Sequence, residues 1–184
     1  LQIEMAADEI DTLKVKMGVP PTDDTAKWEW DSANATGPAL ATTVRAIIDI
    51  KKVFLQQVAP PADGCEADVG LVGVCTESTS FYAEAGGQVA DTGTITTAGG
   101  ATFAVQDVKK FGAYVLHVGV VTAGTLKVGD EAILTVDYAR RAPIAKNHTS
   151  THMLNLALKG ALGLACDQRG SLCDVDKMRF DFAY

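Results

Sequence analysis

Hydrophobic and polar residues alternate with a period of two along the middle of the chain. Val44, Ala46, Ile48 and Ile50 are separated by mostly polar positions, a pattern typical of strands that bury one face. The same pattern predicts further strands at 69–75, around Phe103 and Val105, at 114–120 and at 134–138. Several short strands joined by turns favour a small antiparallel barrel or sandwich, and closure into a barrel would remove exposed edges.

The first forty residues have a different pattern. An apolar stripe predicts an amphipathic helix over 3–17, which Gly18 and the prolines after it terminate. The stripe has no obvious partner nearby, so we expect it to pack on another domain. Asp23 and Asp24 predict the start of a short helix through Trp28, and the small residues of 31–40 indicate a linker.

Helical periodicity returns at Asn147 and ends at Gly163. The apolar stripe of this predicted helix consists of Met153, Leu156, Ala157, Ala161 and Leu162. Residues 177–182 then alternate charged and apolar side chains, which predicts a strand with one buried face. The polar stretch 167–172 contains a glycine and indicates only a turn.

Charge and composition narrow the classes of protein. The net charge is −7, but residues 140–184 hold seven lysines and arginines against four acidic residues, a local charge of +3. A polyanion would therefore dock at the C-terminal end, although a solvated surface explains the same pattern. No apolar run approaches the ~20 residues of a membrane span. The four cysteines indicate reduced thiols rather than a disulfide framework, and Leu1 in place of an initiator methionine suggests a piece of a longer protein.

His148 and His152 are the strongest candidates for metal binding. Residues four apart lie on one helix face, so both imidazoles can reach one ion. Thr149 occupies the position where a metalloprotease has its glutamate base, which argues against peptidase chemistry. Without a third ligand, two such histidines are more often a polar helix face. His117 lies in a predicted strand, where a structural role is expected.

Gly86, Gly87 and Gln88 form the second candidate site. Paired glycines permit positive φ angles and a close approach of substrate to the backbone, and the amide of Gln88 can bind an ester or a ribose. As a free-standing pattern, the triplet is better explained by a β-turn at the rim of the barrel.

Together these segments resemble one known family. Residues 79–93 resemble the glycine-rich signature of alanyl-tRNA synthetases, and 141–152 resemble the first zinc half-site of that family. Residues 168–172 and 178–182 resemble the stretch that follows, and 18–24 resemble the lead-in of eukaryotic-type members. The motifs occur in the family's order, and the resemblance covers nearly the whole chain.

The resemblance implies a fold and a domain layout. Residues 1–40 would be a helical lead-in and linker from an upstream domain, and 41–140 a translation-factor-like antiparallel β-barrel. Residues 141–184 would contribute the first helix and strand of an α/β editing core. The fold class expected is therefore mostly β with an α+β C-terminal part.

The resemblance also implies an activity. Family members ligate alanine to tRNA(Ala) with ATP and Mg²⁺, in an aminoacylation domain outside this sequence. Their editing domain hydrolyses Ser-tRNA(Ala) and Gly-tRNA(Ala), with zinc held by two histidines and a later Cys-x-x-x-His pair. His148 and His152 match the first two ligands. The second pair has no counterpart here, so we expect little stoichiometric zinc and poor deacylase activity from this chain.

Roles for other residues follow from the same resemblance. Gln168 would line the pocket that senses the hydroxyl group of serine, with Thr149 as a neighbour. The terminal adenosine of the tRNA would approach along Gly86, Gly87 and Gln88, while Arg141 and Lys146 would contact phosphates. The expected partner is the acceptor end of tRNA(Ala), and the expected compartment is the cytoplasm, without membrane association. A stand-alone aminoacyl-tRNA deacylase and a non-catalytic module that positions tRNA are the alternatives.

Overall fold

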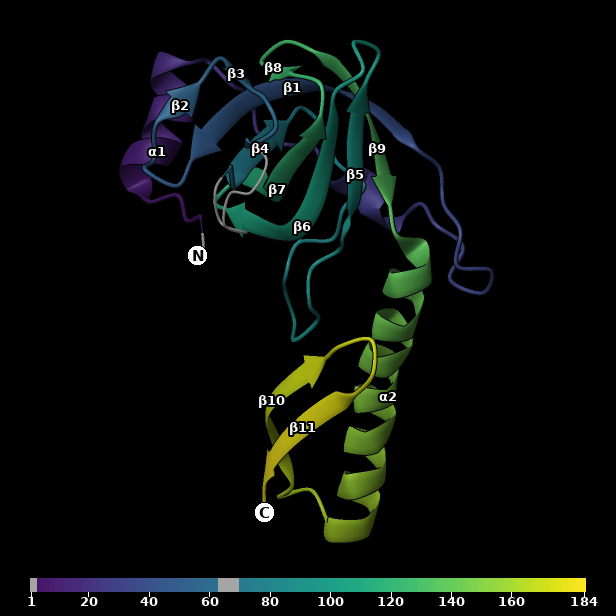
Figure 1. Ribbon diagram of the computed structural model, residues 1–184. Helices are drawn as coiled ribbons and strands as arrows, with labels where there is room; N and C mark the ends of the chain where they lie inside the picture. Colours follow the sequence, from purple (N-terminus) through teal and green to yellow (C-terminus); the bar gives the residue numbers. More distant parts are fainter. Residues whose placement is uncertain (1–2, 63–69) are drawn as a thin grey trace.

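The computed structural model describes residues 3–62 and 70–184. A β-barrel forms one part, and a long helix, α2, extends from it beside the hairpin β10–β11 (Figure 1). A loop between β4 and β5 runs from the barrel towards this hairpin. The C-terminal unit therefore meets the barrel at two places, the start of α2 and the tip of that loop.

Six antiparallel strands close the barrel. They are ordered β1-β4-β7-β6-β5-β9, and β9 pairs with β1 through Leu40 and Leu134. Their bounds are β1 Leu40–Asp49, β4 Val72–Thr76, β5 Gly93–Thr97, β6 Thr102–Phe111, β7 Tyr114–Ala123 and β9 Glu131–Val136. Closure confirms the barrel expected from the period-two pattern. Val69, predicted to begin the second strand, lies outside the described residues.

Three short strands complete the barrel region. They are β2 (Phe54–Leu55), which pairs with β1, and β3 (Gln57–Val58), which pairs with β8 (Leu126–Lys127). The barrel interior is mainly apolar. In strand β9, Ala132, Leu134 and Val136 are buried and alternate with more exposed residues. This period places one face of β9 in the core, whereas β4 and the first six residues of β7 are buried on both faces.

The N-terminal segment packs on the outside of the barrel. The predicted helix over 3–17 is shorter in the structure: α1 spans Ala7–Asp11 and continues as a π-helix, η1, over Thr12–Lys16. Ile3 and Leu13 are fully buried in a cluster with Ala46 and Leu116 of the barrel. The expectation that this stripe packs on another domain was therefore wrong. The short helix predicted near Trp28 is the 3₁₀-helix η2, Thr25–Trp28.

Helix α2 begins earlier than the sequence predicts. It spans Tyr138–Leu162, so the predicted start at Asn147 was nine residues late, and Tyr138 is helical rather than part of a strand. The carboxylate of Asp137 accepts a hydrogen bond from the backbone N–H of Arg140 at 3.0 Å, which caps the first turn. Gly163, with φ +96°, ends the helix where it was expected to end.

A two-stranded hairpin follows α2. Strand β10 spans Asp167–Cys173 and pairs with β11, Met178–Ala183. The strand expected at 177–182 is confirmed, but its expected buried face is not, since no residue of β11 is buried. The stretch expected to be a turn is strand β10. The side-chain amide of Asn147 donates to the carbonyl oxygen of Asp174 at 2.7 Å and ties the hairpin to the helix. Within the described ranges, no helix is long and apolar enough to span a bilayer.

Candidate functional site

The two histidines of α2 lie side by side. The ring centroids of His148 and His152 are 4.9 Å apart, with the rings nearly perpendicular at 89°. His152 is exposed, while His148 is half-buried. Burial lowers the pKa of His148, and the nearby charges of His152 and Arg141 lower it further. A lowered pKa favours the neutral imidazole, which is the form that coordinates a metal.

Across residues 3–62 and 70–184, no group of three or more His, Cys, Asp or Glu side chains could hold a metal ion. The described thiols Cys75, Cys166 and Cys173 are buried and unbonded, whereas Cys65 lies outside the described residues. Two imidazoles are half of the four ligands that a structural zinc site usually has, and the described residues place no further Cys, Asp, Glu or His side chain with them.

Arg141 is buried at the start of α2. Its Nε lies 2.6 Å from Oδ1 of Asp91, and one Nη donates to the carbonyl oxygen of Val89 at 2.8 Å. The guanidinium carbon lies 4.5 Å from the centroid of the Tyr82 ring. Burial raises the pKa of Asp91, and the charge of Arg141 opposes that rise. A phosphate contact by Arg141 would require this ion pair to open.

The triplet Gly86, Gly87 and Gln88 forms the tip of the loop that reaches β10. Both glycines have positive φ, +59° and +81°, which fits their expected use in a tight turn. The carbonyl oxygen of Gly87 accepts a hydrogen bond from the N–H of Cys173 at 2.6 Å, and the N–H of Val89 donates to the carbonyl oxygen of Cys173 at 3.1 Å. The turn is thus not confined to the barrel rim; it holds the hairpin against the barrel.

A pocket of about 190 Å³ lies between the loop, η2 and α2. It brings together four residues named from the sequence: Gln88, Arg141, His148 and Thr149. Gln88 is buried, and its side-chain amide donates to the hydroxyl oxygen of Tyr82 at 3.1 Å. The hydroxyl of Thr149 donates to the carbonyl oxygen of Ala145 at 3.2 Å. The sequence missed the rest of the lining, which consists of Lys27, Trp28, Trp30, Tyr82 and Ala145.

Five residues named from the sequence do not line this pocket, and two of them are Gly86 and Gly87 at the tip of the loop. Lys146 and His152 are exposed on α2. Gln168 is exposed in β10, where it pairs with Phe182. None of the hydrogen bonds among the described residues joins Gln168 to either histidine or to Thr149. Gln168 is thus not part of the lining of this pocket.

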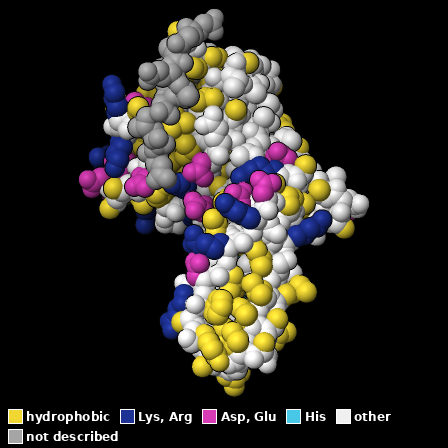
Figure 2. Space-filling view, turned by 60° about the horizontal axis from the view of Figure 1, so that its bottom comes forward, with side chains coloured by type: hydrophobic (Ala, Val, Ile, Leu, Met, Phe, Trp, Pro, Cys, Tyr) yellow, Lys and Arg dark blue, Asp and Glu magenta, His cyan; other side chains and the backbone are white. Residues whose placement is uncertain are grey.

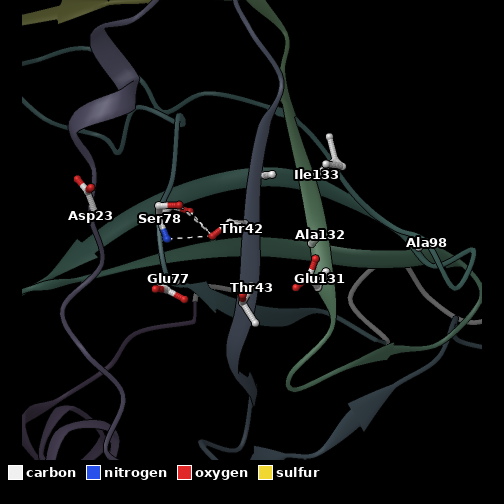
Figure 3. Close-up of a pocket in the computed structure, with 10 residues that line it drawn as sticks. Asp23, Thr42, Thr43, Glu77, Ser78, Ala98, Glu131, Ala132 and Ile133 are labelled. Carbon is white, nitrogen blue, oxygen red and sulfur yellow. Dashed lines mark hydrogen bonds between the residues drawn. The ribbon is translucent and has the colours of Figure 1, made fainter.

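A larger groove of about 610 Å³ lies on the barrel (Figure 3). Ser78 is bonded to Thr42 of β1 there: the backbone N–H of Ser78 donates to the hydroxyl oxygen of Thr42 at 2.9 Å. The charged residues of the lining are all acidic: Asp23, Glu77 and Glu131. Carboxylates repel a polyanion, so the groove is unsuited to RNA despite its size.

The C-terminal unit has an apolar surface. Figure 2 shows hydrophobic side chains gathered over this unit, with charged ones where it joins the barrel. The large apolar residues that are exposed in it are Met153, Leu156, Leu164, Phe182 and Tyr184. The apolar stripe predicted for α2 therefore has little to pack against within the described residues.

Comparison with known proteins agrees with this architecture. A family model described as class II tRNA synthetases (A) matches residues 33–140, which cover the barrel and the first turn of α2. The match extends over more than half of the chain, and the chain belongs to this family.

The similar curated proteins are alanine–tRNA ligases. The cytoplasmic enzyme of Dictyostelium discoideum is 42% identical over 170 residues, covering 90% of this chain and 16% of that protein. The mitochondrial enzyme of Saccharomyces cerevisiae is 39% identical over 166 residues, which cover 90% of this chain and 15% of that protein. The enzyme of Bordetella petrii is 51% identical over 112 residues, which cover 60% of this chain and 13% of that protein. The chain spans about one sixth or less of the length of these relatives.

Proposed function

We propose that this chain is part of an alanine–tRNA ligase and that His148 and His152 supply half of a zinc site that hydrolyses mischarged tRNA. The whole enzyme would ligate alanine to tRNA(Ala) with ATP and Mg²⁺ in a domain outside this sequence, working in the cytoplasm. The region around α2 would clear Ser-tRNA(Ala) and Gly-tRNA(Ala). The similarity to alanine–tRNA ligases over 90% of the chain supports the first part.

The observation that carries the editing proposal is the arrangement of the histidine pair. Two imidazoles on one helix face, 4.9 Å apart between centroids, can direct one nitrogen each at a common ion. They lie on the helix that also forms the wall of the pocket with Gln88 and Arg141. The two remaining ligands would come from a part of the relatives that this chain does not span.

A chemical need for such hydrolysis exists. A pocket shaped for alanine cannot exclude glycine, which is smaller, and it rejects the extra hydroxyl of serine only weakly. Zinc bound at the histidines would polarise the aminoacyl ester or its attacking water. Gln168 and Thr149 would then bind the serine hydroxyl, and the loop at Gly86, Gly87 and Gln88 would guide the acceptor end. Lys146, exposed on α2, is the cation available for phosphate contacts.

The experiment replaces the ligands one at a time in a full-length ligase that contains this region. We expect His148→Ala and His152→Ala each to lower Ser-tRNA(Ala) hydrolysis by more than about tenfold, with alanylation unchanged. Ser150→Ala, on the same helix between the two histidines, is the matched control and should retain hydrolysis. Full hydrolysis by both histidine variants would exclude the proposed site.

One observation favours a second candidate function, a module that positions tRNA without chemistry. The described residues form an aromatic pocket beside the histidine pair, but they include no group of three or more His, Cys, Asp or Glu side chains that could hold a metal ion. In that case the histidine variants would weaken tRNA binding and leave the rate of hydrolysis of bound Ser-tRNA(Ala) unchanged. Single-turnover measurements at saturating enzyme separate these two functions.

A further inference from the structure

Both tryptophans of the chain, Trp28 and Trp30, line the pocket beside His148. Trp30 stacks on Tyr138, with ring centroids 5.6 Å apart and an interplanar angle of 16°. Trp28 meets Tyr82 edge-on at 6.0 Å, yet 67% of its surface is exposed. Large aromatic side chains usually bury most of their surface in a core or an interface. Trp28 is thus held by its neighbours while most of its surface remains available to a ligand.

The cations around this pocket already have partners. Nζ of Lys27 lies 5.2 Å from the centroid of the Trp28 ring and 2.7 Å from a carboxylate oxygen of Asp24. Arg141 is paired with Asp91 in the same way, at 2.6 Å. Because each of these cations already contacts a carboxylate, and Lys27 shares that of Asp24 with Nζ of Lys110 at 2.8 Å, the pocket favours a neutral planar group over a phosphate.

The size of the pocket limits what fits. At about 190 Å³ it is smaller than the roughly 300–1,000 Å³ typical of sites for drug-sized ligands. One ring system can enter, whereas a whole nucleotide would extend into solvent. An aromatic wall and polar atoms on Gln88 and His148 are features of sites that hold an unstacked base of single-stranded RNA.

We propose that this pocket binds one unpaired base of an RNA strand by stacking on Trp28, with the attached sugar on the side lined by Gln88 and His148. The identity of the RNA as the acceptor end of a tRNA rests on the proposed function; the stacking itself does not. Trp28 is a binding residue on this account, and neither the histidine pair nor the glycine loop suggests it from sequence.

The test uses the intrinsic fluorescence of the 184-residue chain, because its only two tryptophans both lie at the pocket. Adenosine 5′-monophosphate is titrated in parallel with ribose 5-phosphate, which lacks the base. The Trp30→Phe variant leaves Trp28 as the sole reporter. We expect quenching and saturation with the first compound, and neither with the second.

Substitution of Trp28 then measures the stacking, with competition against a fluorescent adenosine nucleotide as the readout. Trp28→Ala should weaken binding about 5- to 150-fold, and Trp28→Phe should restore most of it. Because Trp28 is largely exposed, both variants should keep the circular dichroism spectrum and melting temperature of the parent. Equal affinity in Trp28→Ala, or equal binding of ribose 5-phosphate, would overturn the proposal.

The same variants separate this proposal from the editing function. If Trp28→Ala binds the nucleotide normally while the histidine variants of the full-length ligase lose hydrolysis, only the stacking is refuted. If base binding depends on Trp28 while the histidine variants hydrolyse Ser-tRNA(Ala) normally, only the zinc site is refuted.

Discussion

Nε of Arg141 lies 2.6 Å from Oδ1 of Asp91, and both side chains are almost fully buried where α2 leaves the barrel. The other oxygen of Asp91 accepts the N–H of Tyr82 at 2.8 Å. This ion pair therefore joins the first turn of α2 to both ends of the 82–91 loop, which carries the glycine triplet. We regard it as the main electrostatic link between the barrel and the C-terminal unit.

Removing one partner of this pair should be costly. Arg141→Ala leaves the Asp91 carboxylate buried without a counter-charge, and the expected loss is about 3–5 kcal/mol in the free energy of unfolding. Urea denaturation followed by circular dichroism measures it. Lys146→Ala, an exposed basic position on the same helix, should change stability by no more than about 0.5 kcal/mol. Equal effects of the two substitutions would show that the pair contributes little.

The two glycines at the loop tip should respond differently to alanine. A Cβ on Gly87 would meet the carbonyl oxygen of Ser171 at 2.5 Å, whereas one on Gly86 has its nearest atom at 4.0 Å. Both substitutions carry the cost of a positive φ, about 1–2 kcal/mol. Only Gly87→Ala should also release β10, seen as faster hydrogen exchange at the N–H of Cys173. Equal exchange in the two variants would show that the loop tip does not hold β10 in place.

His117 makes stability depend on pH. Burial in β7 lowers the pKa of His117 from 6.5 to about 4. Since the unfolded chain binds this proton more readily, the contribution of neutral His117 to the free energy of unfolding is fully present above pH 6.5 and is lost as the pH falls towards 4. The loss is about 3 kcal/mol. Nδ1 lies 2.9 Å from the carbonyl oxygen of Val74 and must donate to it, so Nε2 accepts from the Thr79 hydroxyl.

Denaturation of the parent and of His117→Gln between pH 7 and pH 4 tests this dependence. The variant should be less stable at pH 7, because it loses well-packed hydrogen bonds, but its stability should fall less steeply with acid. A parallel fall in both proteins would assign the acid sensitivity to other groups.

Gln168 supplies a prediction about substrate choice. Under the proposed function, Gln168→His in the full-length ligase should slow clearance of Ser-tRNA(Ala) more than that of Gly-tRNA(Ala), because only serine carries the hydroxyl that the amide would bind. Deacylation rates on the two substrates measure this. Its neighbour in the strand, Arg169, is also exposed, and Arg169→Ala is the control. Unchanged serine clearance in Gln168→His would remove Gln168 from the site.

The sequence was sufficient for the barrel, because the period of two survives along β6 and β9, although β4 and the first six residues of β7 are buried on both faces. It failed at the start of α2. Leu134, Val136 and Tyr138 continue the same alternation, but Asp137 caps a helix after Val136, and no periodic signal marks that change. Strand β10 was missed because its polar residues face solvent and its pairing partner β11 follows it in the chain.

The candidate site was predicted in part. His148, Thr149 and Arg141 meet Gln88 because α2 and the loop tip converge, and motif spacing was enough to name them. Trp28 and Tyr82 were missed, since their proximity depends on η2 folding back over a loop that lies more than fifty residues away in the chain. One signal of an aromatic site was present in the sequence: its two tryptophans, Trp28 and Trp30, are separated by a single residue.

Helix α2 is continuous from Tyr138 past His148, although it contains Pro143. Ten residues of α-helix span roughly 15 Å. A rotation of the helix about its first turn, at the barrel wall, therefore moves His148 through a larger distance than the turn itself. A tilt of about 10° there would displace the imidazoles by roughly 3 Å, enough to move a nitrogen out of coordination range. A contact that tilted the first turn of α2 would therefore move both histidines without touching them.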